Sequence, residues 1–229
     1  MKFVRRRGLV LIILIALCLF SGCISSPGEN LYIKDNKTYG VTEGAFRHRW
    51  WNYYERGLSF ADGQFFQEAV SDLKQAAKYR IKDQRRARTY GMHFVDYFPH
   101  RELGIVYYQM GNLKEAGREL ELSLNNFPSA KARFYLDRVR KALIEHEAKA
   151  ALPPRLTLSF KADEIWTRED PVVVSGVAED EQYVAGLFIR GVPLFLEGSQ
   201  KRIPFKKSLV LSQGRHAIEV AAKNLLGKV

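Results

Sequence analysis

The sequence predicts a chain of more than one domain, in which an all-α part built from paired helices precedes a β-sandwich. Two stretches carry the same order of small, aromatic and branched residues, 47 positions apart, which is typical of repeated helical hairpins. After Pro153 and Pro154 the apolar residues alternate with polar ones and are rich in valine and isoleucine, as in strands. With 229 residues and a hydrophobic content of 46%, the chain can form one or two modest domains.

The N-terminal residues have the composition of an export signal. Lysine and arginine side chains precede a 12-residue apolar run, 9–20, which is shorter than a helix that spans a bilayer. The sequence Leu-Phe-Ser-Gly-Cys follows at 19–23 and resembles the lipobox of bacterial lipoproteins. The resemblance implies that residues 1–22 are a lipoprotein signal peptide and that Cys23 carries acyl chains such as palmitate. A plain signal peptide with an incidental cysteine is the alternative.

The residues around this cysteine also predict a location. Ile24 rather than an aspartate follows Cys23, and by resemblance to Gram-negative sorting signals this favours a lipid anchor in the outer membrane, on the periplasmic face. Several acyl chains hold a protein more firmly than one. We interpret residues 23–44 as the lipidated cysteine and a flexible tether. The second cysteine, Cys18, lies in the signal, so the mature chain is expected to contain neither a disulfide nor a cysteine metal site.

Residues 45–150 are predicted to form the helical domain from two copies of one pattern. Small residues let one helix lie close to its neighbour, and larger residues fill the groove between them. The matched pairs are Gly57 with Gly104, Phe60 with Tyr107, Phe66 with Leu113, Ala69 with Ala116, Leu73 with Leu120, and Ala76 with Ser123. This pattern resembles the tetratricopeptide repeat (TPR), a unit of about 34 residues that must stack on another unit. The expected helices are 45–61, 65–79, 99–110, 113–125, and a polar capping helix over 129–143 that Ser129 caps.

A long connector at 80–98 accounts for the spacing of 47 residues, which exceeds the usual repeat. It combines basic and aromatic side chains, and its candidate binding residues are Arg85, Arg86, Arg88, Tyr90 and Tyr97. Such a combination could bind a phosphate, a lipid headgroup or a nucleic acid, although export from the cytoplasm argues against nucleic acid. The alternative is a solvated basic surface followed by aromatic residues that fill the gap between the two units.

The resemblance to tetratricopeptide proteins also implies a partner-binding groove. In that family the first helix of each unit lines a concave surface that binds peptides. The residues expected there are Trp51, Tyr54 and Leu58 from the first unit, and Arg101, Ile105, Tyr108 and Gln109 from the second. Aromatic side chains and arginine are common at the centres of protein interfaces. Packing between the two units is the alternative role for the same residues.

Residues 151–154 are interpreted as a proline linker, and 155–229 as the β-sandwich. Strands are expected at 156–160, 172–175, 184–189, 205–211 and 217–221, with the acidic residues 179–181 in a polar loop. The motifs at 174–180 and 216–224 resemble a bacterial immunoglobulin-like domain. In that family one more strand follows, so the sandwich is expected to be incomplete, and the chain is expected to be either the N-terminal part of a longer protein or the product of a truncated reading frame.

The predicted function is a membrane-anchored scaffold of the bacterial cell envelope that binds another envelope protein or peptide. The five histidines show no spacing typical of metal ligands, and no catalytic motif is present, so no enzyme activity, metal or cofactor is expected. Two alternatives stay open. The chain resembles the N-terminal part of lipoproteins that carry a caspase-like peptidase domain, for which it would be an anchoring and regulatory segment. It could also bind peptidoglycan or another glycan.

Overall fold

The computed structural model describes residues 32–147, 152–160 and 164–229, and the chain divides into two compact units, 1–39 and 40–229. The predicted signal peptide, Cys23 and the first part of the tether lie outside the described residues. In the first unit, β1 (Tyr32–Lys34) pairs antiparallel with β2 (Lys37–Tyr39). Asp35 and Asn36 join them with φ angles of 51° and 58°. Two successive left-handed residues match the twist of a tight hairpin, and asparagine and aspartate tolerate that conformation best after glycine.

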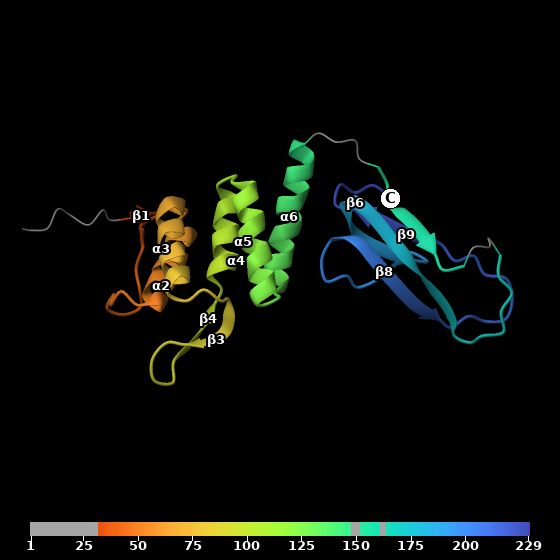
Figure 1. Cartoon of the computed structure of the whole chain (residues 1–229), viewed down its shortest axis with the longest axis horizontal. Coiled ribbons are helices and arrows are strands. Elements are labelled where there is room, and N and C mark those ends of the chain that lie inside the picture. Colours follow the sequence, from red (N-terminus) through yellow and green to blue (C-terminus); the bar gives the residue numbers. More distant parts are fainter. Residues whose placement is uncertain (1–31, 148–151, 161–163) are drawn as a thin grey trace, which may run out of the picture. The chain divides into compact units, whose positions relative to one another are not determined.

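Helices fill the first part of the second unit (Figure 1). The described part of the chain contains five of them: α2 (Trp50–Asp62), α3 (Phe66–Tyr79), α4 (Pro99–Gln109), α5 (Leu113–Asn126) and α6 (Ala130–His146). Pro99 occupies the first turn of α4, where the missing N–H is not needed. The predicted cap of α6 is confirmed, because the Ser129 side chain accepts a hydrogen bond from the backbone N–H of Ala132 at 3.2 Å.

Two pairs of neighbouring helices pack through the same contact between a glycine and a leucine. Gly57 of α2 lies against Leu73 of α3, and Gly104 of α4 lies against Leu120 of α5. Both leucines are fully buried, and a glycine opposite each lets the helix backbones approach closely. The core continues from α5 to α6 through Val139, which is also fully buried. The matched positions in the sequence therefore mark the inner faces of the helices.

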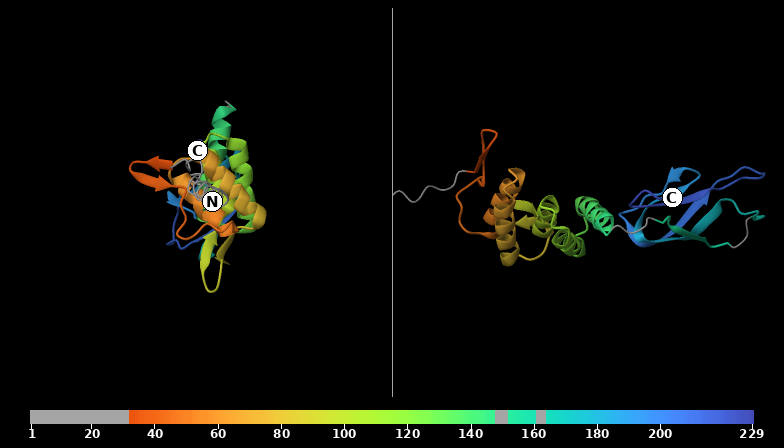
Figure 2. Two further views of the ribbon diagram at one scale, coloured as in Figure 1. Left: turned by 90° about the vertical axis from the view of Figure 1, so that its left-hand side faces the viewer. Right: turned by 90° about the horizontal axis from the view of Figure 1, so that it is seen from above.

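The predicted connector contains a β-hairpin, formed by β3 (Gln84–Arg88) and β4 (Phe94–Tyr97). The hairpin extends away from the helices in both views that show it from the side (Figures 1 and 2). Its base is fixed to the helical core by Tyr97, which is fully buried and donates a hydrogen bond from its hydroxyl to the Arg80 carbonyl at 2.7 Å. The Tyr54 hydroxyl donates to the carbonyl of Asp96 and accepts from the backbone N–H of Phe98, both at 3.1 Å.

The C-terminal part is built around one long strand, β6 (Val172–Ile189). The first part of β6 pairs with β5 (Arg155–Leu158) and β8 (Gln200–Leu209), and its last part pairs with β7 (Val192–Pro193) and β9 (Val220–Asn224), all antiparallel. The buried face carries Val174, Ala178, Leu187, Ile189 and Phe205. Alternate residues of a strand point to one face, so the buried positions of β6 recur at even intervals on either side of a register shift.

The predicted fold class, TPR helical hairpins followed by an incomplete immunoglobulin-like sandwich, is wrong. The five described helices are too few and too short for clear tetratricopeptide repeats: the first members of the two pairs, α2 and α4, have 13 and 11 residues. The described strands form two 2-stranded sheets and one 5-stranded sheet instead of two stacked sheets. The matching positions correctly predicted pairs of packed helices. Similar glycine–leucine contacts occur wherever two helices pack closely, so they do not identify a tetratricopeptide repeat.

Two element boundaries also differ from the prediction. The first helix begins at Trp50 instead of residue 45, because the Asn52 side chain accepts hydrogen bonds from the backbone N–H groups of Arg47 and Arg49 and so fixes the helix start. The acidic residues 179–181 lie inside β6, where a loop was expected. The ladder with β8 breaks between Glu179 and Val184, so the acidic residues accompany a bulge within a continuous strand.

Candidate functional site

The strongest candidate for a binding surface is a group of aromatic side chains on α4 and α6. The Tyr108 ring of α4 lies 6.0 Å from the Tyr135 ring of α6, and the Phe134 ring lies 5.4 Å from the Tyr135 ring. The Arg138 guanidinium lies over the Phe134 ring, 4.5 Å from its centre. Phe134 is 53% exposed. We call these four residues the aromatic surface.

The same two helices are linked by a group of charged side chains. Glu102 of α4 accepts hydrogen bonds from Arg101 Nε at 2.7 Å and from Lys131 Nζ of α6 at 2.9 Å. The Arg101 guanidinium also lies 4.0 Å from the centre of the Phe98 ring. Two cations share one buried carboxylate, so this group carries a net positive charge. It links the first turns of α4 and α6.

Two of the seven residues predicted to line a groove are not exposed. Tyr54 and Ile105 are 5% and 7% exposed, and each packs inside the helical core. Burial raises the pKa of Tyr54 far above its usual value, so its hydroxyl stays protonated and serves as a hydrogen-bond donor. The other positions are half-buried or exposed, and of these Tyr108 alone belongs to the aromatic surface. The remaining ones are Trp51, Leu58, Arg101 and Gln109.

The five residues predicted in the connector divide in the same way. Tyr97 is buried at the base of the hairpin, and burial raises its pKa above the usual value for a tyrosine. Arg85, Arg86, Arg88 and Tyr90 are exposed. Arg88 Nε donates a hydrogen bond to the Gly91 carbonyl at 2.6 Å and so closes the turn of the hairpin. The structure therefore keeps four of the five residues together on one projecting element.

A buried group of acidic side chains and a histidine joins the hairpin to the helices. Asp83 accepts hydrogen bonds from the backbone N–H groups of His100 at 3.1 Å and Arg101 at 3.3 Å, and so caps the start of α4 from 17 and 18 residues away. His100 Nδ1 lies 2.7 Å from Glu119 Oε2, and its Nε2 lies 2.7 Å from the Ile81 carbonyl. Both partners of the imidazole are acceptors, so this geometry favours the doubly protonated, charged form of the ring.

The pKa values in this group are shifted in ways that follow from burial and charge. Burial lowers the pKa of His100, but the hydrogen bond to Glu119 and the nearby charge of Asp83 outweigh it, so the pKa lies above its usual value. Burial raises the pKa of Asp83, and the hydrogen bonds from His100 and Arg101 oppose that shift. Every polar atom described here is directed at another part of the protein. The group is therefore a buried hydrogen-bond network that stabilises the fold, and its polar atoms are not directed at a substrate site.

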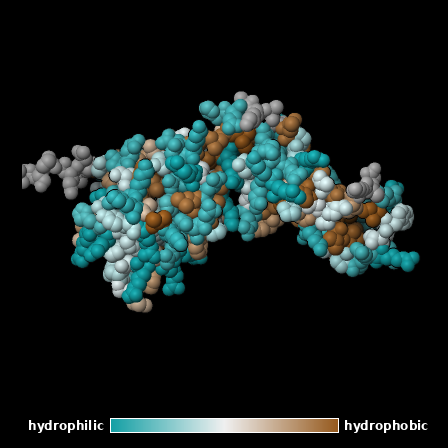
Figure 3. Space-filling view, viewed as in Figure 1, coloured by the Kyte–Doolittle hydropathy of each residue, from teal (hydrophilic) through white to brown (hydrophobic). Residues whose placement is uncertain are grey.

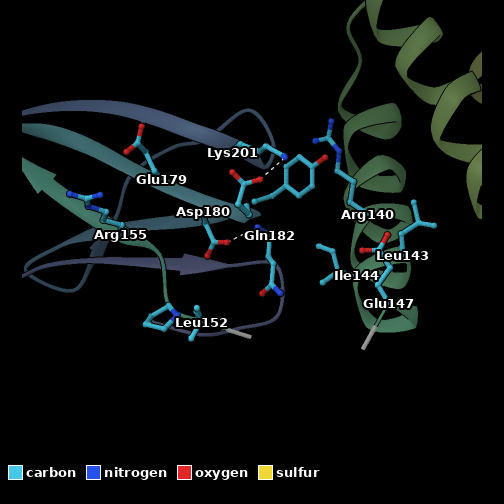
Figure 4. A pocket seen from close by; sticks show the side chains of 13 residues that line it. Arg140, Leu143, Ile144, Glu147, Leu152, Arg155, Glu179, Asp180, Gln182 and Lys201 are labelled. Atoms are coloured by element: carbon cyan, nitrogen blue, oxygen red, sulfur yellow. Dashed lines mark hydrogen bonds and ion pairs between the residues drawn. The ribbon is translucent and has the colours of Figure 1, made fainter. Parts of the chain in front are cut away.

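A pocket of about 620 Å³ lies beside the end of α6 and the sheet strands β6 and β8 (Figure 4). Several of its charged residues are paired within the chain. Lys201 Nζ lies 2.7 Å from Glu181 Oε2, and Asp180 accepts hydrogen bonds from the Gln182 backbone N–H at 2.6 Å and from Asn224 Nδ2 at 3.1 Å. Asp180 and Glu181 of the lining therefore already have partners within the chain.

Neither a metal site nor a membrane-spanning helix occurs among the residues that the structure describes. Within those ranges, no group of three histidine, cysteine or acidic side chains could hold a metal ion. No helix of the described chain combines the length and the apolar character needed to cross a membrane.

Comparison with known proteins gives no family for this chain. Neither the models of protein families nor the curated proteins contain a match to it. Assignment of the site therefore depends on its geometry and chemistry.

Sequence reasoning missed three members of the aromatic surface: Phe134, Tyr135 and Arg138. The helix that carries them was predicted to be a polar cap, because its apolar residues fall on one stripe and its arginines face away from that stripe. The signal was present in the adjacent pair Phe134-Tyr135. Two bulky aromatic residues next to each other cannot both face the core of a single helix, so one of them must lie towards solvent or a partner.

Proposed function

We propose that this chain is a scaffold of the bacterial cell envelope, anchored through an acylated Cys23, that binds another envelope protein through the aromatic surface. The observation that carries the proposal is the exposed ring of Phe134, which has Arg138 over its face and lies beside Tyr135, whose ring in turn lies beside Tyr108. Tyrosine and arginine are enriched among the residues that dominate binding energy at interfaces. Aromatic side chains also bury a large area while losing little conformational entropy.

The chemistry of this surface indicates the kind of segment that it binds. The rings of Phe134 and Tyr135 offer an apolar contact, and Arg138 offers hydrogen-bond donors to a carboxylate. The group formed by Arg101, Glu102 and Lys131 adds net positive charge on the same two helices. The partner segment is therefore expected to combine an apolar or aromatic side chain with an acidic residue. A carboxylate on the partner would also gain from the cation–π contact that already orients Arg138.

The aromatic surface is tested by the proteins that accompany the tagged full chain out of detergent-solubilised envelopes. Replacing a dominant interface residue by alanine weakens binding by about 2 kcal/mol or more, roughly 30-fold. Phe134→Ala is therefore expected to remove a specific partner from the quantified set. Trp166→Ala is the matched control, since Trp166 is 91% exposed and lies in the C-terminal part. If both variants recover the same proteins in the same amounts, the proposed surface is wrong.

The anchor is tested separately by incorporation of an alkyne-labelled palmitate. The wild-type chain is expected to take up the label and to fractionate with the outer membrane, and Cys23→Ser is expected to lose the label. Label in the Cys23→Ser variant, or no label in the wild type, would contradict the anchor. Neither result would bear on the aromatic surface, which is tested independently.

A further inference from the structure

The tip of the β3–β4 hairpin exposes apolar side chains to solvent. Met92 is 81% exposed, Tyr90 is 59% exposed, and Phe94 is 41% exposed. In the space-filling view the projecting hairpin is teal and pale along its length and tan at its end (Figure 3). Large apolar side chains gathered at the end of a projecting element are unfavourable in water, and they gain free energy when a partner or a membrane covers them.

Basic side chains lie directly behind this apolar tip. Arg85, Arg86 and Arg88 are exposed on β3, and Lys82 is exposed just before it. The Arg86 guanidinium lies 5.5 Å from the centre of the Phe94 ring on the neighbouring strand. Asp96 accepts a hydrogen bond from the Arg86 backbone at 3.1 Å. The hairpin therefore has an apolar tip and basic side chains next to it.

Buried side chains and hydrogen bonds fix the hairpin to the helical core. Tyr97 is fully buried at its base, Ala87 is fully buried on β3, and the hydroxyl of Tyr54 bonds to Asp96 and to Phe98 just after the hairpin. At the turn, the Thr89 backbone N–H donates to the His93 carbonyl at 2.9 Å. The apolar tip is therefore a fixed feature of the fold.

We propose that this hairpin docks on a membrane surface that contains anionic phospholipid. Met92, Tyr90 and Phe94 enter the interface between headgroups and acyl chains, and Arg85, Arg86 and Arg88 contact the lipid phosphates. Tyrosine is enriched at this depth of a bilayer, and clustered arginines are attracted to anionic leaflets. The inference goes beyond the proposed function and needs neither the acyl anchor nor the aromatic surface.

The tip geometry favours a membrane over a nucleic acid. Binding of single-stranded nucleic acid uses aromatic rings on which bases stack. Here the Tyr90 ring stacks on the His93 ring at 4.4 Å, and the Phe94 ring faces the Arg86 guanidinium. The most exposed member of the tip is Met92, whose flexible thioether offers no stacking face but inserts readily among acyl chains.

Methionine oxidation tests the proposal on the unaltered full chain. The chain is reconstituted in vesicles of phosphatidylcholine alone or mixed with phosphatidylglycerol and treated with a water-soluble oxidant, and sulfoxide at each methionine is followed by mass spectrometry. Met92 is expected to oxidise several-fold more slowly in the anionic vesicles, while the half-buried Met110 in the helical part oxidises at one rate throughout. Equal oxidation rates of Met92 in the two kinds of vesicle would overturn the proposal.

Charge reversal supplies the matched control. Each basic residue near an anionic surface strengthens partitioning by roughly fivefold, so Arg85→Glu with Arg86→Glu should lower it at least 25-fold, by about the square of that factor. Lys206→Glu with Lys207→Glu changes the net charge equally on exposed positions of β8 and should leave Met92 protected. Equal loss of protection in both double variants would show a general charge effect and contradict a docking hairpin. Protection that appears only when envelope proteins are added would also overturn it, in favour of a protein partner.

Discussion

Replacing Gly104 by alanine tests how closely α4 and α5 pack. A Cβ atom at this position would lie 2.6 Å from Leu120 Cγ and 3.1 Å from the backbone oxygen of Ala116. Leu120 is fully buried, so neither neighbour can move without shifting a helix. Overpacking of this kind costs about 1–3 kcal/mol, and the higher helix propensity of alanine returns about 1 kcal/mol. We expect Gly104→Ala to lower the free energy of unfolding by up to about 2 kcal/mol.

Two other helical glycines give matched controls. A Cβ at Gly57 would lie 3.0 Å from Leu73 Cγ, so the stability of Gly57→Ala is expected to lie between those of Gly104→Ala and Gly117→Ala. A Cβ at Gly117 would meet only Val139 Cγ1 at 3.6 Å, an ordinary contact. Gly117→Ala should therefore benefit from the higher helix propensity of alanine without overpacking, and stabilise the protein by about 0.5–1 kcal/mol.

Urea and thermal denaturation of the purified variants measure this series. For a domain of this size, 1 kcal/mol corresponds to a shift of about 2–4 °C in Tm, so Gly104→Ala and Gly117→Ala should differ by several degrees. The expected order of stability is Gly117→Ala, then Gly57→Ala, then Gly104→Ala. A Gly104→Ala variant as stable as Gly117→Ala would refute the close approach of α4 and α5.

Three further predictions concern the buried polar groups. The raised pKa of His100 means that its charge stabilises the fold fully below its unfolded pKa of about 6.5, and that this contribution is lost as the pH rises through the folded pKa. His100→Gln should therefore lower the free energy of unfolding more in mildly acidic than in alkaline buffer, as urea titrations across pH would show; an equal loss at both would contradict a charged His100. Asp83→Ala should cost about 1–3 kcal/mol because it leaves two backbone N–H groups without an acceptor, and Asp83→Asn should cost less. Equal losses in thermal melts would argue against capping. Tyr97→Phe removes one hydrogen bond to Arg80 and should cost about 1 kcal/mol, again by urea titration, with no change if that bond is absent.

Local features of the fold could be predicted from the sequence, since they depend on neighbours along the chain. Helices α3 to α6 begin and end within a few residues of their predicted limits, because turns such as Gly111-Asn112 and the cap at Ser129 act over one helical turn. The start of α2 was missed because the Asn52 side chain, inside the helix, caps residues before it. The β3–β4 hairpin was predicted only as a connector, since the aromatic residues around it suggested packing without strand pairing.

The features that could not be predicted from the sequence depend on contacts between residues far apart in the chain. Tyr54 looked like a groove residue from its helical position, but its hydroxyl bonds to Asp96 and Phe98, more than 40 residues away. Ile105 lies on the same predicted stripe as Tyr108 and is buried all the same. Periodicity identifies the faces of a helix, but it cannot tell a face that a distant segment covers from one that meets solvent. The fold class failed for the same reason: matched glycine–leucine contacts describe pairs of helices and do not determine how many pairs follow or what covers them.

Photo-crosslinking from the aromatic surface in living cells tests the central claim most directly. A photoreactive amino acid at position 134 of the full chain is expected to form one discrete crosslinked product with an envelope protein, and Tyr108→Ala in the same chain is expected to reduce it strongly. The same amino acid at position 166 should not form that product. Crosslinking from 134 that is absent, diffuse, or unaffected by Tyr108→Ala would contradict a partner-binding scaffold.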